Sequence, residues 1–177
     1  MIATGQDFAD SLSISPYAAK MGYPILLVKQ GKVTETVSKA FKELSINESY
    51  IVGGERAVSG KLEKELPKLI ERIGGNDRYE TSAKIADKFF TTSNKAFLAS
   101  GQVFADALVI GPVATNENAP ILLTQKNDLP KAIRTNIARA KYDKITIVGR
   151  ENAVSKKIIE DIRESLQNGI RILEESL

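Results

Sequence analysis

The sequence of 177 residues contains no cysteine, no histidine and no tryptophan. Without cysteine there can be no disulfide and no thiol nucleophile, and without cysteine and histidine there can be no Cys/His metal site. Without histidine, every catalytic scheme that relies on an imidazole as general base is excluded. The commonest metal and nucleophile sites are therefore ruled out by composition alone.

Long hydrophobic runs are also missing. The longest apolar stretches, residues 24–28 and 120–123, fall far short of the roughly 20 residues that a membrane-spanning helix needs. No basic segment followed by an apolar one opens the chain, so no signal peptide is visible. Because Met1 is followed directly by what reads as the interior of a domain, we expect a processed product or a piece of a longer protein.

The charges are nearly balanced, and the hydrophobic content of 42% is that of a soluble globular protein with a real core. The net charge of +3 favours an acidic partner weakly, through long-range attraction. Acidic residues are interspersed throughout, and no stripe of Lys and Arg alternates with aromatic residues. This pattern argues against a nucleic-acid-binding protein.

An internal repeat organises the chain, with an offset of 96 residues and no gap. The recurring blocks are 3–10 and 99–106, 24–27 and 120–123, 51–53 and 147–149, and 57–59 and 153–155. Several separate blocks in one register are the mark of a modular array. We therefore expect two structurally equivalent units.

Each unit alternates short apolar runs with segments of helical periodicity. In the second unit the expected strands are 95–99, 120–124 and 144–148, and the expected helices are 104–118, 130–140 and 155–162. Strands that are apolar on both faces and separated by helices indicate a parallel sheet covered on both sides. The predicted fold is α/β, with tandem three-layer modules and mainly parallel sheets.

The connection between the units carries helix-start signals. Asp77 and Glu80 have the spacing of a capping box, and Ser155 is a plausible N-cap for the last helix. The expected apolar face of the helix after Asp77 consists of Tyr79, Ser82, Ala83, Ala86, Phe89 and Phe90. We place the boundary so that residues 1–69 form a first, N-terminally truncated unit and residues 70–177 a second, complete one.

Four blocks of this sequence follow one another in a recognisable order. They are Arg72-Ile-Gly-Gly-Asn-Asp-Arg-Tyr-Glu-Thr81, Ala99-Ser-Gly-Gln-x-Phe-Ala-Asp-Ala-Leu108, Pro120-Ile-Leu-Leu123, and Ile147-Val-Gly149 with Ala153-Val-Ser155. Over essentially the whole chain, this succession resembles the type 2 cell-wall-binding repeat of Gram-positive surface proteins. One departure is Arg150, which stands where the first unit has Gly54.

The resemblance implies a function and an assembly. It implies a non-enzymatic module that anchors secreted, S-layer-associated proteins to the cell wall by binding an anionic secondary wall polymer non-covalently, without a cofactor. It also implies Toprim-like modules that usually come in threes around a pseudo-threefold axis. A fold alone does not establish the function that the resemblance implies.

Candidate polymer-binding residues cluster where the second unit begins. Gly75 and Asn76 precede a predicted helix whose N–H groups can face a phosphate, and Arg78 adds a fork of donors beside Tyr79. Exposed contacts of this kind are weak singly, so several modules would act together. Secondary candidates lie next to turns after predicted strands: Arg72, Arg56 and Arg150. The alternative is a tight turn in which Asp77 caps the helix and Arg78 forms an internal salt bridge.

The repeated Asp10 and Asp106 stand near the carboxyl end of a predicted strand, where open α/β sheets bind ligands. We interpret them as structural, because a phosphate would be repelled by them. A metal-dependent phosphoryl-transfer enzyme of Toprim-like fold would need clustered acidic residues to hold Mg²⁺. Asp7 is replaced by Val103 in the repeat and no Asp-x-Asp occurs, so the sequence argues against that alternative.

The truncated first unit has a structural consequence. It lacks the counterpart of residues 70–90, so we expect one strand edge and one helix-sized apolar face to be uncovered. Exposed edges and apolar patches recruit partners. We therefore predict that the chain self-associates or packs with a further repeat.

Overall fold

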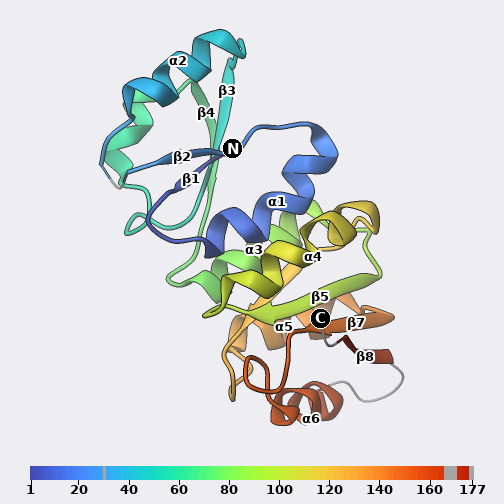
Figure 1. The fold of residues 1–177 in the computed structure, drawn as a ribbon. Helices are drawn as coiled ribbons and strands as arrows, with labels where there is room; N and C mark the ends of the chain where they lie inside the picture. The colour runs from blue at the N-terminus through green and yellow to red at the C-terminus, as the bar shows by residue number, and fades with distance from the viewer. Residues whose placement is uncertain (30, 166–170, 176–177) are drawn as a thin grey trace.

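The computed structural model describes residues 1–29, 31–165 and 171–175, so parts of the second predicted unit, 166–170 and 176–177, lie outside the described residues. It contains two four-stranded sheets with the orders β2-β1-β3-β4 and β6-β5-β7-β8 (Figure 1). Every strand pair in both sheets is parallel. The predicted α/β class with parallel, helix-covered sheets is confirmed.

The elements follow one another in the same order in both units. The first sheet and its connections comprise β1 (Ile2–Thr4), α1 (Ala9–Met21), β2 (Leu26–Val28), α2 (Glu35–Glu43), β3 (Glu48–Val52), the 3-10 helix η1 (Gly60–Glu65) and β4 (Lys68–Ile73). Then come α3 (Arg78–Phe89), β5 (Lys95–Ser100), α4 (Phe104–Asn116), β6 (Ile121–Thr124), α5 (Lys131–Ala140), β7 (Lys144–Val148), α6 (Lys156–Ser165) and β8 (Arg171–Glu175).

The repeat seen in the sequence is repeated in the strand register. Ile2 pairs with Leu26 in the first sheet, and Leu98 pairs with Leu122 in the second, which is the same pairing shifted by 96 residues. Both units also keep a proline inside the helix after the first strand, Pro16 in α1 and Pro112 in α4. The prediction of two equivalent units therefore holds for their topology and pairing.

Strand β4 crosses the boundary predicted between residues 69 and 70. It pairs in parallel with β3 from Lys68 to Ile73, so the first sheet extends to Ile73. Most of its side chains are exposed or half-buried, because it is the outer strand of the sheet. The turn after Ile73 then leads from the first sheet into α3.

Helix α3 serves both units. Tyr79, Ala83 and Ala86 belong to the core around the second sheet, whereas Ile85 and Phe90 belong to a core that covers the first sheet. The single apolar face predicted for this helix is therefore divided between two cores. Figure 1 shows α1, α3 and α4 lying between the two sheets, with α2 and α6 at the outer ends.

Of the two predicted N-caps, Asp77 caps its helix and Ser155 does not. Asp77 Oδ1 accepts a hydrogen bond from the backbone N–H of Glu80 at 2.7 Å, and Glu80 Oε2 accepts one from that of Asn76 at 2.8 Å. This is a capping box shifted by one residue, since the glutamate reaches the residue before the cap. Ser155 directly precedes α6, but its buried Oγ finds no hydrogen-bond partner.

One apolar face of the first unit is uncovered, as the sequence predicted. Leu123 in β6 is 1% exposed, because α3 packs on that strand and Ser82 Oγ accepts a hydrogen bond from the Leu123 N–H. Its counterpart in β2, Leu27, is 51% exposed. The difference is the helix, which the first unit lacks at that position among the described residues.

Candidate functional site

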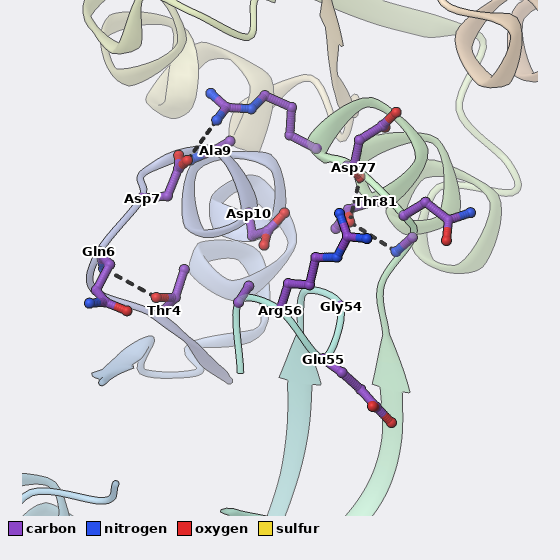
Figure 2. A pocket seen from close by; sticks show the side chains of 14 residues that line it. Thr4, Gln6, Asp7, Ala9, Asp10, Gly54, Glu55, Arg56, Asp77 and Thr81 are labelled. Carbon is purple, nitrogen blue, oxygen red and sulfur yellow. Dashed lines mark hydrogen bonds and ion pairs between the residues drawn. The ribbon is translucent and has the colours of Figure 1, made fainter. Parts of the chain in front are cut away.

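A cleft of about 770 Å³ opens at the carboxyl ends of β1 and β3. Three segments line it: the loop after β1 with the start of α1, the loop after β3, and the turn into α3 (Figure 2). The lining residues are Thr4, Gln6, Asp7, Ala9, Asp10, Gly54, Glu55, Arg56, Ala57, Gly75, Asn76, Asp77, Arg78 and Thr81. This edge is where open parallel sheets place their ligands.

The cleft is a junction between repeats. The first two segments belong to the first unit, and the third begins the second unit. The loop after β3 and the turn into α3 pack so closely that glycine is required at their contact. A Cβ on Gly54 would lie 2.5 Å from the carbonyl oxygen of Gly75. One repeat therefore supplies only part of the lining of the cleft, and the next repeat supplies the rest.

Asp10 forms the buried part of the cleft. The residue is 8% exposed, and burial, followed by the charge of Asp7, raises the pKa of its carboxyl group to about 6 against the opposing effects of Arg78 and Thr81. It lies against Gly53, whose φ of +118° favours glycine. Asp106 and Gly149, with φ of +110°, repeat this pair in the second unit. The structural role predicted for both aspartates fits this contact.

The turn before α3 has already used several of its N–H groups. The N–H of Gly75 donates to Thr81 Oγ1 at 3.0 Å, and the N–H groups of Asn76 and Glu80 donate to the carboxylates of Glu80 and Asp77. The Asn76 N–H is also the largest cause of the lowered pKa of Glu80. Side-chain oxygens of the protein thus already accept some of the hydrogen bonds at the helix N-terminus that the sequence suggested as a phosphate site.

Arg78 joins the two units. One terminal nitrogen of its guanidinium donates to Asp7 Oδ2 at 2.6 Å and the other donates to the carbonyl oxygen of Gly101. The guanidinium also lies over the ring of Phe8, 5.8 Å from its centroid. The internal salt bridge that the sequence left as an alternative is therefore formed, with partners on both sides of the repeat junction.

This geometry predicts the outcome of replacing Arg78 with alanine. Hydrogen bonds to charged groups contribute about 1.5–3 kcal/mol each, and a domain of this size loses roughly 2–4 °C of melting temperature per kcal/mol. We expect Arg78→Ala to lower the melting temperature by several degrees and to leave wall binding by the folded fraction unchanged. Thermal denaturation and wall sedimentation measure the two effects. Weaker binding at an unchanged melting temperature would instead make Arg78 a ligand contact.

The other predicted site residues separate into two groups. Gly75, Asn76 and Arg56 line the cleft with Arg78, and Figure 2 shows Arg56 extending into it while Glu55 points away. Outside the cleft, Tyr79 lies in the second core at 9% exposure, and Arg150 is exposed on the second unit.

Arg72 also lies outside the cleft lining, and it braces the loop behind it. Its guanidinium donates to Glu63 Oε1, at 2.9 Å from Nη2, and to the carbonyl oxygens of Gly53 and Val58. Three partners within the protein fix this side chain in place. Arg72 therefore supports the loop after β3 from behind.

Sequence reasoning missed several residues of this cleft as site residues. They are Thr4, Gln6, Asp7, Asp10 and Thr81. The available signal was position, because Thr4 ends the apolar strand β1, Gln6, Asp7 and Asp10 come soon after it, and loops at the carboxyl ends of parallel strands converge. Thr81 carried no such signal, since it reaches the cleft only because α3 begins at its edge.

Comparisons with known proteins agree with this architecture. The profile of the family described as cell wall binding domain 2 matches residues 1–63 and 72–159. N-acetylmuramoyl-L-alanine amidase LytC of Bacillus subtilis is 28% identical over 163 residues, which span 92% of this chain and 33% of that protein. The amidase enhancer of the same organism is 32% identical over 89% of this chain and 22% of its own length. This chain thus spans a third or less of these two relatives.

A solved structure shows the same fold at higher coverage. Cwp8 from Clostridium difficile superposes with a TM-score of 0.84 and 30% identity, over 99% of this chain and 30% of that one. The resemblance inferred from the sequence blocks is thereby confirmed by profile, sequence and fold together. The chain belongs to the cell wall binding domain 2 family and is a cell wall anchoring module of the kind found in Gram-positive surface proteins.

Proposed function

We propose that this chain holds its parent protein at the cell surface by binding an anionic secondary wall polymer non-covalently, and that it has no catalytic role. The observation that carries the proposal is the pattern of coverage. Two relatives with different names, an amidase and an amidase enhancer, share this segment although it spans only 33% and 22% of them. A segment common to both suits a shared anchor better than either activity.

The proposed polymer contact is the cleft at the repeat junction. It brings together Arg56, Gly75 and Asn76, three of the residues that the sequence suggested. The net charge of +3 favours the approach of an anionic polymer. Among the described residues, no group of three or more acidic side chains could hold a metal ion, and no helix is long and apolar enough to cross a membrane.

Wall sedimentation tests this proposal. The purified chain should sediment with Gram-positive walls and remain in the supernatant after the secondary polymer has been extracted. Binding should weaken as salt rises, because exposed charges are screened over about 8 Å at physiological ionic strength. A chain that hydrolysed the wall, or bound extracted walls equally well, would contradict it.

We also propose that a second copy of the chain packs on α4. In the first unit, α1 uses Phe8 and Leu12 against the core of the second unit. The equivalent positions of α4 and their neighbours are exposed by 43–56%: Val103, Phe104, Leu108, Val109 and Val113. Helix α1 packs one face on the second unit, and α4, its counterpart in the repeat, exposes the equivalent face to solvent. A second copy of the chain could cover this face in a head-to-tail contact.

Light scattering tests this association. We expect the wild type to form oligomers as its concentration rises, and Val109→Asp to shift it to the monomer, because a carboxylate in the contact must be desolvated. Leu44→Asp is the matched control, since Leu44 is equally exposed at 56% but lies at the end of α2. A strictly monomeric wild type at high concentration would contradict the proposal.

A further inference from the structure

We propose that the cleft at the repeat junction binds an uncharged glycosyl unit of the wall polymer through its hydroxyl groups, and that the anionic linkages of the polymer stay outside the cleft. This inference rests on the proposed function and names the part of the ligand that enters. It follows from three properties of the residues that line the cleft: their charges, the N–H donors that are already hydrogen-bonded within the protein, and the oxygen acceptors that a ligand could use.

The charges of the lining do not suit a phosphate. Three carboxylates line the cleft, those of Asp7, Asp10 and Asp77, against the two guanidinium groups of Arg56 and Arg78, while the side chain of Glu55 points away. The guanidinium group of Arg78 is paired with Asp7 at 2.6 Å. Like charges brought together across an interface oppose binding. An anion entering the cleft would meet an excess of negative charge.

Several of the donors that a phosphate would need are already in use. At the start of α3, the N–H groups of Gly75, Asn76 and Glu80 donate to side chains of the protein. The Asn76 side-chain amide donates to Glu80 Oε2 at 2.8 Å. A helix N-terminus attracts an anion through unsatisfied N–H groups, and here the N–H of Glu80 and those of the two residues Gly75 and Asn76 before the helix are satisfied within the protein.

Acceptors, in contrast, are plentiful. Asp10, a residue only 8% exposed, lines the cleft with its carboxylate, and the amide groups of Gln6 and Asn76 each carry an acceptor oxygen. Sugar hydroxyls donate as well as accept, so they match a lining of carboxylates and amides. The volume of about 770 Å³ lies within the range of small-molecule sites, roughly 300–1,000 Å³. A neutral sugar unit fits both the chemistry and the space.

The second unit supplies a matched control. Asp106 lies against Gly149 as Asp10 lies against Gly53, but Asp106 is not among the residues that line this cleft. A substitution that disturbs only the contact with glycine should affect both positions. An effect on ligand binding should appear at Asp10 alone.

The experiment uses a teichoic-type polymer whose repeat units are joined by phosphodiesters. Hydrofluoric acid cleaves these linkages and leaves a phosphate-free oligosaccharide. Calorimetry would measure the binding of the intact polymer, the phosphate-free oligosaccharide and inorganic phosphate to the full chain. We expect the oligosaccharide to bind and to compete with the polymer, inorganic phosphate to do neither, and Asp10→Asn to weaken oligosaccharide binding roughly tenfold or more.

Asp106→Asn should bind the oligosaccharide as the wild type does. If Asp10→Asn fails to fold, Asn76→Ala at the exposed rim of the cleft replaces it, with the same expected loss. Binding of the polymer and of inorganic phosphate without binding of the oligosaccharide would overturn this inference and leave the proposed function intact. No binding of the polymer or of intact walls would overturn both.

Discussion

Gly74→Ala is expected to destabilise the protein by about 3 kcal/mol or more, at the upper end of the cost of forcing extra atoms into a packed site, and to abolish wall binding. A Cβ at this position would lie 2.5 Å from the backbone nitrogen of Gly54 and would also overlap the carbonyl group of Gly53. Those contacts are with backbone, which cannot rotate away. The loop after β3 would have to move, and with it the wall of the cleft.

The measurement is thermal or urea denaturation together with wall sedimentation. Gly31→Ala is the control, since a Cβ there meets nothing within 4 Å and its φ does not lie in the left-handed region. We expect this variant to be as stable as the wild type within about 1 kcal/mol or to gain slightly, as glycine-to-alanine changes at compatible sites do. Equal stabilities of the two variants would show that the turn before α3 tolerates a shift.

Leu123→Ala and Leu27→Ala, the same substitution at equivalent positions of the two repeats, are expected to differ several-fold in cost. Truncating a buried leucine costs about 2–5 kcal/mol, through lost transfer energy and the cavity left behind. Leu123 is 1% exposed beneath α3, so it should show this loss. Leu27 is 51% exposed, so its loss should stay below about 1 kcal/mol.

Chemical denaturation at low protein concentration measures both values. If the two substitutions cost the same amount, Leu27 must be covered in solution, either by a second copy or by another segment. Repeating the measurement at high concentration separates these cases, because a second copy protects Leu27 only when the chain associates. A concentration-independent cost at Leu27 would exclude the second copy as the cover.

Much of the fold could be predicted because the apolar segments that form the core occur in both repeats. The apolar blocks 24–27 and 120–123 mark equivalent strands, and each overlaps a strand of the structure, β2 (Leu26–Val28) and β6 (Ile121–Thr124). Strand β4 escaped prediction because it is an outer strand, and Lys68, Glu71 and Arg72 interrupt its apolar residues. The boundary was therefore placed inside it. Its pairing with β3 depends on contacts that sequence periodicity does not report.

The site could be predicted only in part, because it depends on which charges find partners. Gly75 and Asn76 were placed correctly beside a helix start, since turn chemistry is local. The role of Arg78 was not decided by the sequence, because its acceptor Asp7 lies 71 residues away. The helix predicted over 130–140 is α5, Lys131–Ala140, and Pro130 stands just before it.

The measurement that tests the central claim most directly is sedimentation of the purified chain with Gram-positive cell walls, before and after extraction of the secondary polymer. The chain should sediment with intact walls and be released when the polymer is removed. Gly74→Ala, which disturbs the junction between the repeats, should stay in the supernatant in both cases. Equal sedimentation with extracted walls, or none with intact walls, would contradict the claim that this chain is a polymer-binding wall anchor.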